Sequence, residues 1–138
     1  MNTKPLLATI MVVLFSFSAI AHDSSKEYMS AEEVRQSLLD TTFKGVFIDT
    51  TSGEARKYSA YNSPEGISYY RDETGHEESA AVMVRDDGCF YGNWELGDEF
   101  DGCYYYQDNG DGTFTEYTPS NRVNTITVVP GDPENLSD

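Results

Sequence analysis

Residues 89–129, CFYGNWELGDEFDGCYYYQDNGDGTFTEYTPSNRVNTITVV, hold the pattern that decides the fold. Short runs rich in Tyr, Phe, Val, Ile and Thr alternate with clusters of Gly, Asp, Asn and Pro, which is typical of β-strands joined by tight turns. The run 124–128 alternates polar and apolar side chains, which predicts one buried and one solvated sheet face. This stretch predicts strands over 89–96, 103–107, 113–118 and 123–129.

The same pattern extends back to residue 43. Turn residues recur at intervals of roughly 8–12 residues, which suits an antiparallel meander. Four further strands are predicted over 43–50, 55–61, 66–71 and 79–85.

A single helix is predicted before the strands, over 31–40. Ser30 and Glu33 have the spacing of a capping box, and Val34 and Leu38 repeat at helical spacing. The fold class is therefore mainly β, with one short N-terminal helix followed by an antiparallel meander of about eight strands. The strands are expected to form a curled sheet or a small barrel.

The first 21 residues have the order of a secretory signal peptide. A positive charge at Lys4 precedes an apolar run over 6–15, and the small residues Ala19 and Ala21 precede the expected cleavage point. A membrane anchor is the alternative, but the apolar run is short for a span of about 20 residues. We therefore expect a secreted or periplasmic protein with no membrane span after cleavage.

The rest of the chain is long enough for one domain. The predicted organisation is a signal peptide over 1–21, a flexible N-terminal segment over 22–29, a single β-rich domain over 30–129 and a flexible tail over 130–138.

The chain is strongly acidic, with 9 Lys and Arg against 24 Asp and Glu and a net charge of −15. Loss of Lys4 with the leader would make the charge one unit more negative. Such a surface repels the phosphates of nucleic acids and anionic lipid head groups. It can attract a basic protein partner or divalent cations. High solubility is the simplest consequence of this charge.

Cys89 and Cys103 are the only cysteines, and export favours a disulfide between them. A metal-thiolate site is the alternative, but no histidine lies nearby in the sequence. One long hairpin turning at 99–100 would hold the two residues roughly 23 Å apart, whereas a disulfide needs Cα atoms within about 4.4–6.8 Å. We therefore expect the strand to break or bend at Gly92, or Cys89 to lie on another neighbour of Cys103.

Two groups of residues are candidate metal ligands. His22 would become the N-terminus after cleavage, and its amine and ring nitrogen, with His76 as a third nitrogen, resemble the copper brace of secreted oxidative polysaccharide-cleaving enzymes. Asp98, Glu99 and Asp101 crowd one turn and offer oxygen ligands for calcium. The chain has no nucleophile-elbow, reactive-cysteine or phosphate-loop motif. A cofactor-free, non-enzymatic domain is the favoured interpretation.

The aromatic residues are the most suggestive candidates for binding. Neighbouring rings along a strand lie on opposite faces of the sheet, so some rings can face outward and stack on a sugar or anchor a protein. Ordinary strand composition is the simpler explanation of their number. The candidate binding residues are Tyr69, Tyr70, Trp94, Tyr104, Tyr105 and Tyr106.

The order of motifs along the chain also resembles a known type of domain. Gly92-Asn93-Trp94 is followed by Cys103 and a tyrosine-rich strand. With the leader and the short helix, this order resembles small periplasmic bacterial domains of unknown function that have a lipocalin-like or meander sheet. The resemblance covers residues 30–129 and implies a fold type without an activity. In lipocalins the G-x-W triplet belongs to the first strand, whereas here it lies in the middle of the chain.

These observations rank three functions. The leading hypothesis is a secreted or periplasmic acidic binding domain that binds or inhibits a basic protein partner. The first alternative is a small-ligand or carbohydrate binder that uses tyrosines at a barrel mouth. The second is a small metal-dependent enzyme, either a copper oxidase or a small hydrolase.

Overall fold

The computed structural model describes residues 27–49, 51–95 and 97–138. The predicted leader over 1–21, His22 and the start of the segment 22–29 lie outside the described residues. The elements are α1 (Ala31–Leu38), β1 (Thr41–Ile48), β2 (Ala55–Asn62), β3 (Ile67–Asp72), β4 (Glu77–Val84), β5 (Phe90–Gly92), the 3₁₀ turn η1 (Asp98–Phe100), β6 (Gly102–Asp108), β7 (Thr113–Tyr117) and β8 (Val123–Pro130).

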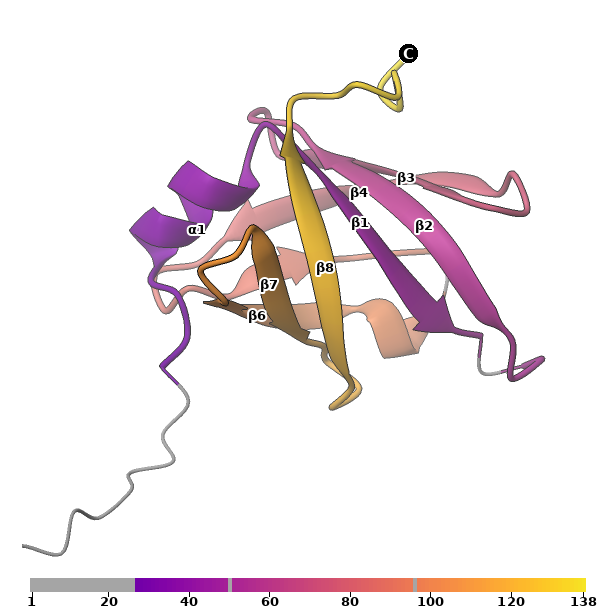
Figure 1. Cartoon of the computed structure of the whole chain (residues 1–138), viewed down its shortest axis with the longest axis horizontal. Coiled ribbons are helices and arrows are strands. Elements are labelled where there is room, and N and C mark those ends of the chain that lie inside the picture. Colours follow the sequence, from indigo (N-terminus) through magenta and orange to yellow (C-terminus); the bar gives the residue numbers. More distant parts are fainter. Residues whose placement is uncertain (1–26, 50, 96) are drawn as a thin grey trace, which may run out of the picture.

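The eight strands form a closed antiparallel barrel in sequence order (Figure 1). Strand β1 pairs with β2 along its whole length, and it closes the barrel by pairing with β8 from Thr41↔Pro130 to Lys44↔Thr127. The mainly β fold with one helix is thus confirmed, and of the two predicted arrangements the structure has the barrel. Closure removes the sheet edges that would otherwise offer unpaired backbone groups.

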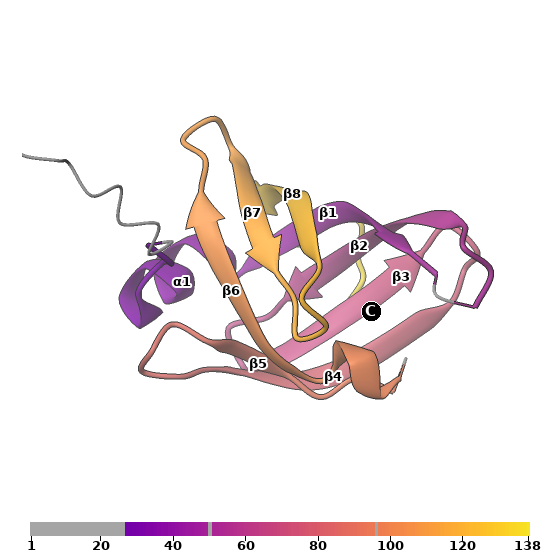
Figure 2. The same cartoon turned by 90° about the horizontal axis from the view of Figure 1, so that it is seen from below.

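Helix α1 covers the end of the barrel where β1 begins. Its N-terminus has the predicted capping box, in which Ser30 and Glu33 bond each other's backbone amides. Val34 and Leu38 are fully buried and belong to the same core cluster as Phe43 of β1 and Ile126 of β8. Figure 2 shows α1 at one end of the barrel and η1 near the opposite end. The helix ends at Leu38, two residues earlier than predicted.

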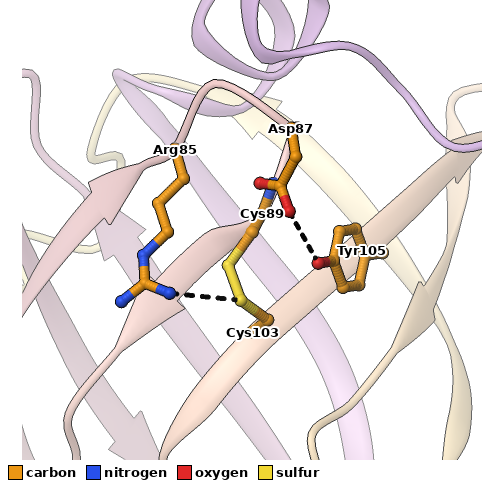
Figure 3. The surroundings of a disulfide bond; sticks show 5 residues. All are labelled: Arg85, Asp87, Cys89, Cys103 and Tyr105. Carbon is orange, nitrogen blue, oxygen red and sulfur yellow. Dashed lines mark hydrogen bonds between the residues drawn. A yellow bond between two sulfur atoms is a disulfide. The ribbon is translucent and has the colours of Figure 1, made fainter.

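The region between the cysteines corrects the predicted strand 89–96. Strand β5 ends at Gly92, and the chain continues through a loop and η1 before β6 begins at Gly102. The predicted break at Gly92 is confirmed, as is the disulfide, whose Cα atoms lie 5.2 Å apart (Figure 3). A single long hairpin is therefore not formed.

Gly92 is required because the indole ring of Trp94 lies against it. A Cβ atom at residue 92 would come within 2.6 Å of Trp94 Nε1. The glycine thus allows the chain to fold back so that the indole lies over the end of β5. This contact explains why glycine occurs two residues before tryptophan in Gly92-Asn93-Trp94.

Gly92→Ala is expected to lower the free energy of unfolding by about 1–3 kcal/mol, as overpacking of a tight contact does. It should also shift the fluorescence maximum of Trp94, because the ring must move. Denaturant titration followed by fluorescence measures both effects. Asn93→Ala, at the exposed neighbouring position, serves as the control. Equal stability and an unchanged spectrum for both variants would contradict this role of Gly92.

The C-terminal segment after β8 contacts the barrel. The sequence predicts a flexible tail from residue 130; in the structure the Asp132 carboxylate accepts the backbone amides of Leu136 at 2.8 Å and Ser137 at 3.0 Å. The Leu136 side chain is buried, and Lys44 of β1 forms an ion pair of 3.3 Å with Glu134. These contacts place the segment against β1.

Candidate ligand cavity inside the barrel

The barrel interior contains a cavity of about 110 Å³. Its lining comes from several strands and from the loop that carries Trp94 and η1. Phe43, Phe90 and Tyr106, which also belong to the core cluster beneath α1, line its inner end. Concave, largely apolar spaces with a few polar groups are the usual form of small-molecule sites.

Five aromatic rings form a continuous wall along this cavity. Tyr58 and Tyr70 stack with centroids 5.7 Å apart, and Phe47 contacts Tyr58 at 6.1 Å and Phe100 edge-on at 6.0 Å. Trp94 meets Tyr70 edge-on at 6.1 Å. The rings come from three strands, the loop and η1, so barrel closure brings them together.

Glycine at position 45 makes room for one of these rings. A Cβ atom there would lie 2.9 Å from Tyr58 Cε1 on the adjacent strand. Gly45 and Gly92 therefore have the same role. Each leaves free the space that a Cβ atom would fill, and an aromatic ring from another residue occupies that space.

Arg122 and Glu99 tie the outer end of the cavity together. Arg122 Nη1 donates to the carbonyl oxygen of Ile48 at 2.8 Å, and Nη2 lies 3.9 Å from Glu99 Oε2. These contacts connect the start of β8 with the end of β1 and with η1. The Tyr104 hydroxyl adds a bond of 2.6 Å to the carbonyl oxygen of Phe100.

Glu116 of β7 is buried within the barrel. Its Oε2 accepts the Tyr106 hydroxyl at 2.9 Å, and its Oε1 accepts Asn124 Nδ2 at 3.2 Å. Burial raises the pKa of the Glu116 carboxyl, and the bonds from Asn124 and Tyr106 oppose that rise. Among the described residues that line the cavity, Glu116 is the only acidic one.

Asn62 and Ser68 provide polar atoms that lack a partner. They face each other in the register of β2 and β3, and each is 1% exposed. Asn62 Nδ2 and Ser68 Oγ are fully buried and make no hydrogen bond with the described residues. Both residues line the cavity. An unsatisfied buried polar group costs about 1–3 kcal/mol, so these atoms need a partner that the described residues do not provide.

The predicted binding residues divide between the two faces of the barrel. Tyr70, Trp94, Tyr104 and Tyr106 line the cavity. The other two lie on the outer face: Tyr69 stacks on Tyr61 with centroids 6.4 Å apart, and Tyr105 donates to Asp87 Oδ2 at 3.0 Å (Figure 3).

Sequence reasoning missed Phe47, Tyr58, Phe100, Asn62, Ser68 and Glu116. A usable signal existed for Glu116, because it is two residues after Phe114 and therefore on the same face of its strand.

The candidate metal ligands within the described part of the chain do not form a cluster. His76 Nε2 lies 3.3 Å from Glu78 Oε2, and Asp101 Oδ1 accepts the backbone amide of Trp94 at 2.5 Å. Asp98 and Glu99 lie in η1. Across residues 27–49, 51–95 and 97–138, no three His, Cys, Asp or Glu side chains are placed to hold a metal ion. His22 lies outside the described residues.

Comparisons with protein-family models, with curated proteins and with solved structures found no match to this chain. Within the described part of the chain, no helix is long and apolar enough to cross a membrane.

Proposed function

We propose that this protein is an exported small-molecule binder whose site is the interior of the barrel. The single observation that carries the proposal is the pair of unpartnered buried polar atoms, Asn62 Nδ2 and Ser68 Oγ, lining an aromatic-walled cavity. A bound molecule would supply the missing hydrogen bonds. A bound water molecule would supply them too, so the proposal needs a direct test.

The two kinds of lining would have separate roles. The aromatic wall removes apolar ligand surface from water, which contributes about 25 cal/mol per Å² of buried area. The polar side chains of Asn62, Ser68 and Glu116 would fix the orientation of the ligand. Asn62 Nδ2 and Ser68 Oγ make no hydrogen bond with the described residues, and the Glu116 carboxylate can accept more bonds than the two it has. The expected ligand is a compact molecule with an apolar body and polar groups.

Export remains part of this proposal. The leader pattern over 1–21 supports it, and the Cys89–Cys103 disulfide is consistent with an oxidising extracellular compartment. The leading sequence hypothesis, a basic protein partner, stays a prediction that rests on the net charge, the aromatic strands and the lack of a catalytic motif in the sequence. A pull-down that captures one basic protein at low salt and releases it at high salt would support that hypothesis.

Benzyl alcohol, a neutral ring with one hydroxyl, is expected to bind with a Kd on the order of 1 mM. Trp94 is the only tryptophan and lines the cavity, so its fluorescence should change saturably with the ligand concentration. Ala60→Leu adds a side chain at a buried position in the cavity lining and should weaken binding about tenfold or more.

Ser59→Leu, at the neighbouring position of β2, is the matched control, since adjacent residues of a strand lie on opposite faces. It should leave the affinity unchanged. Circular dichroism checks that both variants are folded. Binding that survives Ala60→Leu in a folded protein would place the ligand elsewhere, and no response of Trp94 to any ring probe would contradict the proposed function.

A further inference from the structure

None of the described basic residues serves as a counter-ion to Glu116 inside the barrel. No basic side chain of the described residues lies within 4.0 Å of its carboxylate, and its two oxygens each accept one neutral donor. An ionised carboxylate accepts about four hydrogen bonds, so Glu116 can still accept from a ligand. Buried carboxylates are normally paired, and this one is available for pairing.

The other titratable groups around Glu116 do not supply a positive charge. Tyr58, Tyr104 and Tyr106 interact with it from β2 and β6, and burial raises the pKa of all three hydroxyls, which keeps them neutral. Arg122 lies at the outer end and is engaged by Ile48 and Glu99. The environment of the carboxylate is therefore aromatic and neutral.

The aromatic rings around Glu116 and the absence of a nearby positive charge among the described residues both favour binding of a cation. Aromatic faces attract ammonium groups through their quadrupole, and desolvation strengthens this attraction. The net charge of −15 also raises the local concentration of small cations near the protein. A carboxylate and an aromatic wall in one cavity can thus stabilise the charge of an ammonium group in place of its hydration shell.

We propose that the cavity takes a small organic cation, a protonated amine carried on an apolar or aromatic body, with the ammonium group at Glu116. This inference rests on the proposed small-molecule function and names its ligand class. The rings of the cavity wall would hold the body, and the amine would donate to the lone pairs of Glu116 that Tyr106 and Asn124 leave free.

Three probes with one ring and different charge test the ligand class: benzylamine, benzyl alcohol and benzoate. At neutral pH the wild-type protein is expected to bind benzylamine about tenfold tighter than benzyl alcohol, and benzoate more weakly than both. Calorimetry or Trp94 fluorescence gives the three affinities under identical conditions. Equal affinity for the amine and the alcohol, or a preference for benzoate, would overturn the proposal.

Glu116→Gln keeps the size of the side chain and can still accept from Tyr106. It should lower the affinity for benzylamine about tenfold and change that for benzyl alcohol less than about twofold. Glu54→Gln, which removes one exposed carboxylate in the turn before β2, controls for net charge and should leave both affinities unchanged. An unaltered preference for the amine in folded Glu116→Gln would also overturn the proposal.

The pH dependence of the wild-type protein gives an answer even if Glu116→Gln does not fold. Because burial raises the pKa of the Glu116 carboxyl, this group loses its proton at a higher pH than exposed acids. As the pH rises above the range in which exposed carboxyls ionise, roughly pH 4–5, the affinity for benzylamine should therefore still increase, whereas that for benzyl alcohol should stay constant. A flat profile for benzylamine contradicts the proposal.

The three probes distinguish a failure of the small-molecule function from a failure of the ligand class. If none of the three probes binds, the small-molecule function fails and the ligand class fails with it. If benzyl alcohol binds in the cavity and benzylamine binds no better, only the ligand class is wrong.

Discussion

Replacing Cys89 and Cys103 together by alanine is expected to lower the free energy of unfolding by about 3 kcal/mol, the chain-entropy value for a closed loop of about 15 residues. The bond joins positions 14 residues apart. It also strengthens a weak part of the barrel wall. Strand β5 has only three residues, and it pairs with β4 and with β6 through three residue pairs each. Chemical denaturation of the oxidised wild type and the double variant measures the difference.

The same substitution should weaken binding of a ring probe. The loop closed by the disulfide carries Trp94 and Phe100, which both line the cavity. Treating the wild-type protein with a reductant should reproduce both effects, whereas reductant should leave the double variant unchanged. A difference in unfolding free energy below about 1 kcal/mol would contradict the structural role given to this bond.

Leu38→Ala is expected to cost about 2–5 kcal/mol of unfolding free energy, the usual range for truncating a buried leucine. Leu38 is fully buried at the end of α1 and packs in the core cluster that includes Phe43 and Phe90. Thermal and denaturant unfolding measure the loss. Gln36→Ala, on the exposed face of the same helix, is the control and should change stability by less than about 0.5 kcal/mol.

Leu38→Ala also distinguishes an effect on stability from an effect on ligand binding. Leu38 is absent from the cavity lining, so folded Leu38→Ala should keep a ring-probe affinity close to that of the wild type. Little change in stability would mean that α1 does not close the barrel as described. A well-folded variant with a large loss of affinity would mean that the helix contributes to the site.

The local elements were predictable because their signals are local. The capping box at Ser30 and Glu33 and the alternation over 124–128 depend on residues close together in the chain. The break at Gly92 followed from the geometry that two cysteines impose on a hairpin. The short length of β5 did not follow from the strand pattern, because the stretch after Gly92 is rich enough in aromatic and apolar residues to resemble a strand.

The site was less predictable because it depends on barrel closure. Tyr70, Trp94, Tyr104 and Tyr106 were identified as aromatic candidates, but only closure decides that they share one cavity. Asn62 and Ser68 are unremarkable in the sequence. Their importance lies in the lack of a hydrogen-bond partner, which depends on every neighbour in space.

Nuclear magnetic resonance of ¹⁵N-labelled protein titrated with benzyl alcohol shows directly whether a small molecule enters the barrel. The side-chain amide of Asn62 and the indole of Trp94 report from the cavity, and Asn109, in an exposed turn, serves as an internal control. We expect the Asn62 and Trp94 signals to shift together with one Kd while the Asn109 signal stays fixed. Unchanged Asn62 and Trp94 signals, or shifts confined to the outer cluster of Tyr28, Tyr105 and Tyr117, would contradict it.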